Sequence, residues 1–335
     1  SVVVESGAPV TTEQAHDIQS ISGYDGSASD YDITDNAAAL ISAGDHVLNV
    51  DGVDVVTVSD GATTAQEGQI LAGFTADVEF DVADDVGDLK AVMSSNDPAG
   101  HLTEANSITV DNDGNGDRVV NANDGAILAG FTADVAFDVV DDANAVAAEV
   151  AGAGVGSLDE ALDVAVISGD VNTADAAAIQ QISGYNETGS DYEITDNAGA
   201  VIGAGDSVIE DGGVTRVEVT GDASALQGVD LNAYSANVDF DVRDTADAIA
   251  TNSGNLGKAD EVFVDSGGVA VDVAEAQAIQ GLAGYQAGAS EYEIEDNAAA
   301  VISATDSVLA NGNIHVDVND GTGSSVVNAN DGAML

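Results

Sequence analysis

A five-residue phrase, aromatic–acid–aliphatic–any–Asp, occurs six times along the 335 residues and limits the fold more than any other feature. The first copy runs from Tyr31 to Asp35. Each later copy begins 49, 57, 55, 48 or 52 residues after the start of the copy before it, in that order. Self-similarity at such a period is typical of proteins that stack small structural repeats. The sequence therefore predicts a stack of strand–helix repeats, although length alone would suggest two or three globular domains.

Each copy of the phrase predicts a short strand followed by a helix. Side chains alternate along a strand, so Tyr31 and Ile33 should enter the core while Asp32 and Thr34 face outward. We expect Asp35 to cap the helix that follows it, with Ala37 and later apolar residues returning to the same core. The same capping role is expected for the last residue of every copy, namely Asp35, Asp84, Asp141, Asp196, Asp244 and Asp296.

A second kind of strand–helix repeat lies between these copies. Its strand is exemplified by Val55–Asp60, and its helix stops at a Gly placed just before an aromatic residue, as at Gly73 and Phe74. Counting both kinds gives about thirteen strands, near Val3, Ile33, Val56, Phe80, Val110, Val139, Val166, Ile194, Val217, Val242, Val271, Ile294 and Val316. About 26 residues per turn is the size of a leucine-rich repeat. The predicted fold is α/β, a right-handed β/α solenoid of about thirteen turns with a parallel sheet.

The predicted domain organisation is one continuous solenoid over residues 1–335. The last seventeen residues match residues 112–128 at thirteen positions, but the earlier copy continues into a further strand. A solenoid needs a polar cap at each end, and neither end of the sequence supplies one. We therefore expect that the chain continues or that another subunit stacks on it.

The charge excludes several classes of partner. There are 61 Asp and Glu residues against five Lys and Arg, which gives a formal net charge of −56. Nucleic acids and anionic membranes both require basic patches, so neither is an expected partner. No stretch of the sequence is apolar enough to insert into a membrane. Such a charge repels itself unless counterions relieve it, and either bound divalent metal or high salt would do so.

Two sets of acidic residues are candidate calcium ligands. The first consists of the mid-strand acids, which should line an exposed face of the sheet: Asp32, Asp81, Asp138, Glu193, Asp241 and Glu293. The second is the loop from Asp111 to Asp117, in which Asp111, Asp113, Asn115 and Asp117 offer oxygen atoms at alternate positions, as in the first half of a calcium loop. The alternatives are a solvated face that discourages aggregation and an ordinary surface turn. The acid expected at the twelfth loop position is replaced by Ala122.

Other kinds of chemistry have little support. Cysteine is absent, so disulfides and thiolate metal sites cannot form. The four His residues are scattered with no zinc-ligand spacing, and there is no nucleophile-elbow, phosphate-loop or HExxH motif. We expect that the protein is not an enzyme.

The repeated phrase, extended to aromatic–acid–aliphatic–any–Asp–any–Ala, resembles the large, acidic, cysteine-free repeat proteins of bacterial surfaces. These include surface-layer proteins and calcium-dependent adhesins. The resemblance implies an extracellular or cell-surface structural protein that assembles with copies of itself into a filament, sheath or layer, with calcium as a cofactor and cell-surface polysaccharide as a further partner. The alternatives are an adhesin stalk and a polysaccharide-acting enzyme built on a solenoid.

Overall fold

The computed structural model describes residues 1–335 except 6, 95–101, 132, 154–157, 312 and 320–335. The predicted C-terminal repeat at 319–335 therefore lies almost entirely outside the described residues. The chain divides into two compact units. The first comprises residues 1–141, 145–165 and 181–186, and the second comprises 142–144, 166–180 and 187–335.

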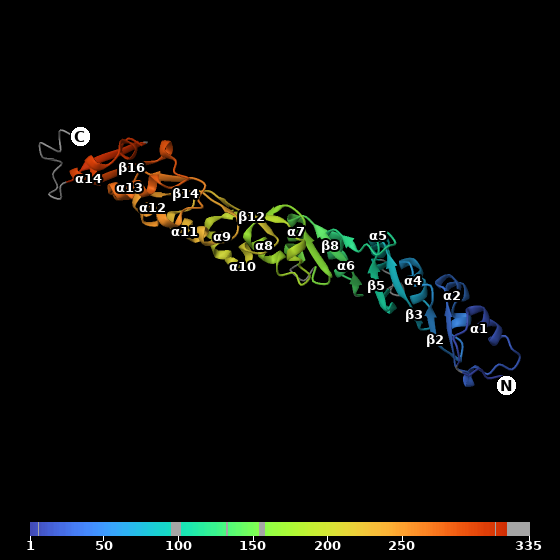
Figure 1. Cartoon of the computed structure of the whole chain (residues 1–335). Helices are drawn as coiled ribbons and strands as arrows, with labels where there is room; N and C mark the ends of the chain where they lie inside the picture. Colours follow the sequence, from blue (N-terminus) through green and yellow to red (C-terminus); the bar gives the residue numbers. More distant parts are fainter. Residues whose placement is uncertain (6, 95–101, 132, 154–157, 312, 320–335) are drawn as a thin grey trace. The chain divides into compact units, whose positions relative to one another are not determined.

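Short helices alternate with strands along the chain (Figure 1). The helices are α1 (Thr12–Gln19), α2 (Ala37–Ala43), α3 (Asp45–Leu48), α4 (Ala65–Ala72), α5 (Val86–Met93), α6 (Ala122–Ala129), α7 (Ala143–Ala153), α8 (Thr173–Ile179), α9 (Ala198–Ala204), α10 (Asp206–Ile209), α11 (Ala225–Ala233), α12 (Ala246–Asn252), α13 (Val273–Gln280), α14 (Ala298–Ser303) and α15 (Asp306–Leu309). Short 3-10 segments are η1 (Gly26–Ala28), η2 (Leu102–Glu104), η4 (Glu187–Gly189), η5 (Ser253–Asn255) and η6 (Ala287–Ala289). No helix among these described elements is both long enough and apolar enough to cross a bilayer.

The strands are short, and ten pairings between the described strands are parallel. They are β1 (Tyr31–Asp35), β2 (Val53–Val58), β3 (Val78–Glu79), β4 (Asp81–Asp84), β5 (Ser107–Val110), β6 (Val119–Val120), β7 (Val135–Ala136), β8 (Asp138–Asp141), β9 (Asp163–Val166), β10 (Asp170–Val171), β11 (Tyr192–Asn197), β12 (Val214–Thr220), β13 (Val238–Asp239), β14 (Val242–Thr245), β15 (Val262–Asp265), β16 (Glu291–Asp296) and β17 (Asn313–Val318). The predicted α/β class and parallel pairing are thus confirmed.

One continuous sheet is not found. The described strands form six separate sheets of two to four strands. Three of the breaks fall where a buried Phe interrupts a strand. β3 pairs with β2 and β4 pairs with β5, and only Phe80 separates β3 from β4. Phe137 separates β7 from β8 in the same way, and Phe240 lies between β13 and β14. Because the ladder changes partner at each ring, neighbouring repeats are joined by several short sheets.

Most of the predicted strand positions are occupied, but two are not: near Val3 the described residues form only isolated bridges, from Val2 to Tyr24 and from Val10 to Ile33, and the strand expected at Val271 is displaced. Val271 forms only an isolated bridge to Ile294, and the strand of that repeat is β15. Val262 and Val264 in β15 are buried while Phe263 is half-buried, so the missed strand shows the expected alternation.

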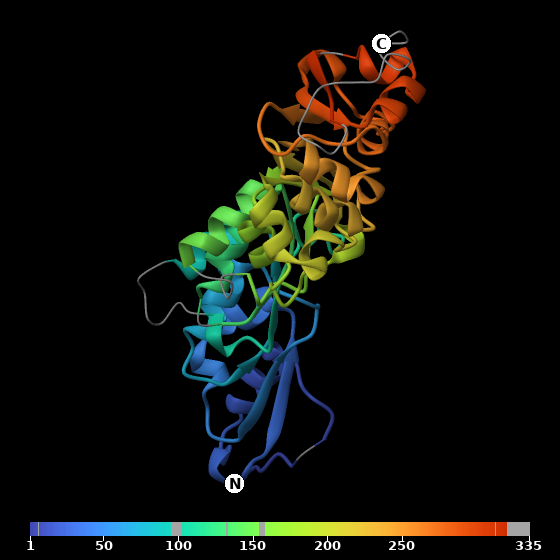
Figure 2. The same ribbon diagram turned by 90° about the vertical axis from the view of Figure 1, so that its left-hand side faces the viewer.

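Helices pack closely against the strands that flank them (Figures 1 and 2). Small residues at the contact allow this approach. A Cβ atom added to Gly228 in α11 would lie 2.8 Å from a methyl group of Leu256 and 2.9 Å from one of Val242. Gly68 in α4 and Gly125 in α6 face the equivalent Val82 and Val139 at 2.8 Å. Any larger residue at these positions would push the helix off the strand.

The strand-terminal aspartates join one helix to the next strand, and we call them the inter-repeat aspartates: Asp35, Asp84, Asp141, Asp196, Asp244 and Asp296. In each, Oδ2 accepts the first backbone N–H of the preceding helix, from Thr12, Ala65, Ala122, Thr173, Ala225 and Val273 respectively, at 2.9–3.2 Å.

The expectation that each inter-repeat aspartate caps its own helix was wrong. The N-cap of α2 is Asn36, that of α5 is Asp85, and that of α9 is Asn197. Each inter-repeat aspartate lies one residue too early for that role, at the end of an extended strand. Its carboxylate therefore reaches the helix of the previous repeat, whose first N–H groups have no partner within the helix.

Candidate metal centre

The outward positions of the strands carry the acidic residues that the sequence predicts as metal ligands. Among the mid-strand acids, Asp81 and Glu293 are exposed, while Asp32, Asp138, Glu193 and Asp241 are half-buried. Their neighbours in the strands, such as Tyr192 and Ile194 beside Glu193, are buried. The alternation therefore places these side chains where the sequence predicts.

Several mid-strand acids interact with groups of the protein itself. Ser107 Oγ donates to Asp81 at 2.6 Å, and the backbone N–H of Glu261 donates to Asp241 at 3.0 Å. Arg118 pairs with Asp138 at 3.2 Å, but the other carboxylate oxygen of Asp138 is buried without a hydrogen-bond partner in the described structure. The acids therefore do not form a uniform row of equivalent sites.

The predicted calcium loop has a different internal arrangement. The backbone N–H groups of Asn115 and Asp117 donate to Asp113 Oδ1 at 2.8 and 3.3 Å, and that of Gly116 donates to Asp111 Oδ1 at 2.9 Å. These backbone hydrogen bonds hold the pKa of Asp113 below its ordinary value. Gly114 and Gly116 adopt positive φ, which the tight bend requires. The loop carboxylates accept from the loop backbone and do not form one of the metal-sized clusters found among the described residues.

An arginine occupies the centre of the carboxylate face formed by β11, β12 and β13. Glu193 on β11 is in register with Arg216 on β12, and Glu218 lies two residues further along β12. Arg216 pairs with Glu193 at 3.5 Å, with Glu218 at 3.1 Å and with Asp239 at 2.5 Å. Hydrogen bonding to Asp239 and the charges of all three acids raise the pKa of the guanidinium. A single positive charge therefore links three strands.

An open groove of ≈ 500 Å³ adjoins this arginine. Four acids line it, Asp170, Asp191, Glu193 and Glu218, together with the polar residues Ser168 and Thr195. Asp170 is in register with Glu193. The groove is therefore a strongly anionic surface.

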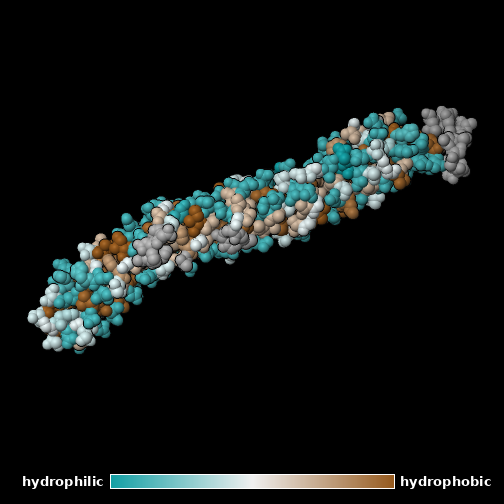
Figure 3. Space-filling model, turned by 180° about the vertical axis from the view of Figure 1, so that it is seen from behind, coloured by the Kyte–Doolittle hydropathy of each residue, from teal (hydrophilic) through white to brown (hydrophobic). Residues whose placement is uncertain are grey.

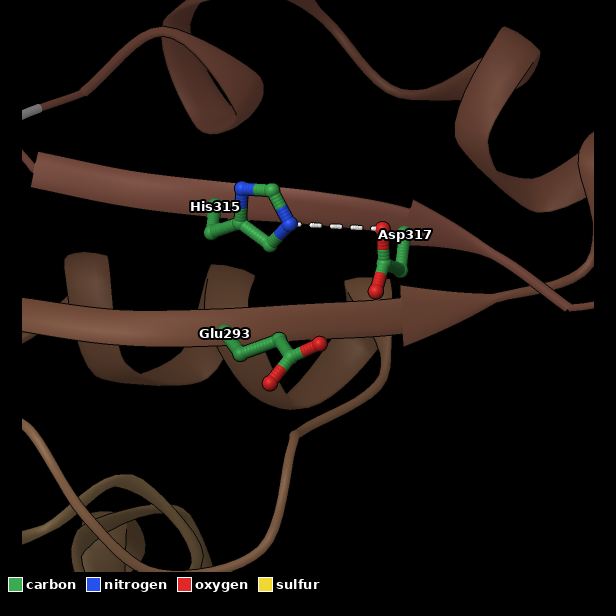
Figure 4. Close-up of side chains that lie close together, drawn as sticks. All are labelled: Glu293, His315 and Asp317. Atoms are coloured by element: carbon green, nitrogen blue, oxygen red, sulfur yellow. Dashed lines mark ion pairs between the residues drawn. The ribbon is translucent and has the colours of Figure 1, made fainter. Parts of the chain in front are cut away.

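The strand pair β16 and β17 carries a cluster of potential ligands, Glu293, His315 and Asp317 (Figure 4). Glu293 is in register with His315, and Asp317 is two residues beyond His315 on the same side of β17. One ligand atom from each residue lies within 4.8 Å of the others, and His315 Nε2 is 3.3 Å from Asp317 Oδ1. A hydrogen bond shared with Asp317, helped by the charge of that carboxylate, raises the pKa of Glu293.

A second cluster consists of Asp84, Asp85 and Asp88 at the start of α5. Asp85 caps the helix by accepting the backbone N–H of Asp88. The neighbouring charges of Asp85 and Asp84 raise the pKa of Asp88. Asp85 is placed by capping α5, and Asp84 by accepting the backbone N–H of Ala65 at the start of α4.

Sequence reasoning identified Glu293 but missed His315 as its neighbour. The four His residues have no zinc-ligand spacing with one another, but His315 lies beside two carboxylates, those of Glu293 and Asp317. The signal was available in the repeat, because Glu193 and Arg216 are separated by 23 positions and Glu293 and His315 by 22. An alignment of the copies therefore places His315 at the position of Arg216.

The comparisons with known proteins give no further guide to the site. No family model, curated protein or solved structure matches the chain.

Proposed function

We propose that this chain is an extracellular structural protein whose strand–helix repeats form a right-handed β/α solenoid, of about thirteen turns by the repeat count. In this proposal the protein assembles with copies of itself into a filament, sheath or surface layer at the cell surface, and calcium bridges its acidic strand faces. The supporting observation is the outward placement of carboxylates on parallel strands that are held in register.

The electrostatics of that face provide the physical reason for a cation. Parallel neighbours in a sheet lie about 4.8 Å apart. Two carboxylates about 5 Å apart repel by about 0.8 kcal/mol in water, and by more beside a protein surface. Divalent cations between such pairs convert the repulsion into attraction, within one chain or between two.

The protein has few cations of its own to do this. Each of the five Lys and Arg residues lies in the described part of the chain and already has a partner there. Lys90 pairs with Asp124, Arg118 with Asp138, and Arg243 with Asp222 and Asp265, while Arg216 holds the three acids described above and Lys258 donates to the carbonyl of Tyr234. The remaining acids need external counterions.

The polarity of the surface also favours binding to partners through polar contacts. The face shown in Figure 3 is mainly hydrophilic, with hydrophobic residues in small separate patches. Assembly through acidic faces should therefore depend on divalent ions rather than on a large apolar interface.

The decisive experiment is thermal unfolding of the purified chain at moderate salt, with and without a calcium chelator. We expect chelation to lower the melting temperature by roughly tens of degrees, because ions bound only to the folded state stabilise it by mass action. Calcium should restore the melting temperature and produce ordered assemblies visible by electron microscopy, whereas sodium at equal ionic strength should do neither. An unchanged melting temperature would remove structural calcium, and stability regained only in molar salt would indicate adaptation to high salt.

A further inference from the structure

The copies of the repeat differ at one outward position, and the difference concerns a positive charge. Glu193, Arg216 and Glu218 correspond in the repeat to Glu293, His315 and Asp317. Both sets have the same parallel register, with the first acid opposite the basic residue. In the first set a guanidinium lies among the acids. In the second set an imidazole takes its place.

The second set lacks a permanent cation. All five Lys and Arg residues are engaged elsewhere in the described structure, and His315 is paired only with Asp317 among the ion pairs found there. Glu293 and Asp317 each offer a carboxylate oxygen that lies within 4.8 Å of the other and of a nitrogen of His315. In the first set, the charge of Arg216 offsets the repulsion among the acids. Beside His315, a bound cation would offset the repulsion between Glu293 and Asp317.

The donor atoms indicate which kind of ion. One imidazole nitrogen and two carboxylates, all within 4.8 Å, form a three-ligand set that leaves room for water in the fourth position. Calcium prefers six to eight oxygen ligands, whereas imidazole suits zinc, copper and nickel. All three residues are exposed, so an ion can reach them directly from solvent.

We propose that Glu293, His315 and Asp317 bind a divalent transition-metal ion of the zinc class, through His315 Nε2 and one oxygen from each carboxylate. The metal takes the place that Arg216 fills in the corresponding repeat. Metal ligands must be deprotonated to bind the ion, so zinc competes with protons at this site. Glu293 also belongs to the mid-strand acids of the proposed calcium face, but the nitrogen ligand of His315 favours zinc over calcium at this position.

The test is calorimetric titration of the intact chain with zinc chloride in excess calcium, in two buffers of different ionisation enthalpy. We expect one zinc site whose apparent enthalpy depends on the buffer, because protons are released. The substitution His315→Arg should abolish that site by supplying a fixed cation. The reciprocal substitution Arg216→His should add a second site among Glu193, Glu218 and Asp239. Glu291→Gln, an exposed change on the same strand as Glu293, is the matched control and should leave zinc binding unchanged.

Circular dichroism of each variant checks that it folds, and Co²⁺ absorption gives a second readout of nitrogen and oxygen ligation. Zinc binding that persists in folded His315→Arg, or its absence from the unaltered chain, would overturn the proposal. The calcium-dependent melting temperature and assembly of His315→Arg are measured alongside. If His315→Arg loses zinc binding but its melting temperature and assembly still depend on calcium, the zinc site is confirmed. If neither the unaltered chain nor any variant depends on calcium, only the proposed function is contradicted.

Discussion

The strand pairs β11–β12 and β16–β17 are two copies of one repeat that differ in the basic residue beside their outward acids. Both bury a Tyr and an Ile on the inner side and present acids on the outer side. In the first copy, Arg216 joins Glu193, Glu218 and Asp239. In the second, His315 pairs with Asp317, and Glu293 has a raised pKa. The backbone register thus tolerates either arrangement, because the scaffold beneath the acids is the same.

That scaffold includes a polar network repeated in both copies. Gln180 Nε2 donates to Tyr192 Oη at 2.8 Å and to the Val208 carbonyl at 3.1 Å. Gln280 donates to Tyr292 Oη at 2.7 Å and to the Val308 carbonyl at 3.1 Å. The network fixes a helix end to the buried face of each strand, so the outer face can vary without loss of register.

The largest difference between the copies should appear when their inter-repeat aspartates are removed. Asp196 accepts from the backbone N–H and the hydroxyl of Thr173, whereas Asp296 has only the backbone N–H of Val273 at that place. We expect Asp196→Ala to cost about 2–3 kcal/mol of unfolding free energy and Asp296→Ala about 1–2 kcal/mol. Urea unfolding measures both. Glu291→Ala, an exposed change, should stay within about 0.5 kcal/mol, and equal losses for the two aspartates would contradict the role of Thr173.

Removing the tyrosine hydroxyls should affect both copies equally. Tyr192→Phe and Tyr292→Phe each lose one hydrogen bond from a Gln that keeps its bond to a backbone carbonyl. We expect each to cost about 1 kcal/mol. The check is a double-mutant cycle with Gln180→Ala and Gln280→Ala, respectively. A cost confined to one copy would show that the two scaffolds are not equivalent.

The sequence pattern predicts the α/β class and parallel pairing because both depend on local periodicity. Alternation of Tyr192, Glu193 and Ile194 defines an inner and an outer side whatever the neighbours are. The pattern does not predict the six separate sheets, because a buried aromatic such as Phe80 or Phe137 looks the same in the sequence whether a strand continues through it or stops there. Whether a segment forms a strand depends on its local sequence, whereas the strand with which it pairs depends on residues far away in the chain.

The same distinction explains the errors at the candidate site. The residue type of Asp35 correctly indicates an acceptor for helix N–H groups, but the helix it serves begins at Thr12, 23 residues earlier. His315 was overlooked because its importance comes from Glu293 on a neighbouring strand. Ligands contributed by different repeats become visible in a sequence only when the repeats are aligned on one another.

The two copies should respond to acid in opposite directions. Burial alone would raise the pKa of Asp196, but hydrogen bonds from Thr173 and Asn197 outweigh it and lower the pKa below its ordinary value of 3.8. A lowered folded-state pKa means that the unfolded state binds more protons, so this contribution is present above about pH 4 and is lost as the pH falls further. Glu293 has a raised pKa, so its unfavourable charge is relieved on acidification.

The lowered pKa of Asp196 and the raised pKa of Glu293 predict how two substitutions change the dependence of stability on pH in acid. Asp196→Asn should lower stability at neutral pH and flatten the profile below about pH 4, where the native carboxylate would take up its proton. Glu293→Gln should raise stability at neutral pH and leave little difference from the unaltered chain in acid. Urea unfolding at several pH values measures both. A steeper acid profile for Asp196→Asn would contradict the assignment of its hydrogen bonds.

Replacing each of the two basic residues should give the smallest effect and the most direct comparison. In metal-free buffer of low ionic strength, His315→Arg should raise the melting temperature, because it places a fixed positive charge beside the carboxylates of Glu293 and Asp317. Arg216→Gln should lower it by leaving three acids without their common partner. These groups are exposed or half-buried, so both shifts should shrink as salt screens the charges over about 10 Å at 0.1 M. Shifts that persist in high salt would mean that packing of the side chains, rather than charge, distinguishes the two copies.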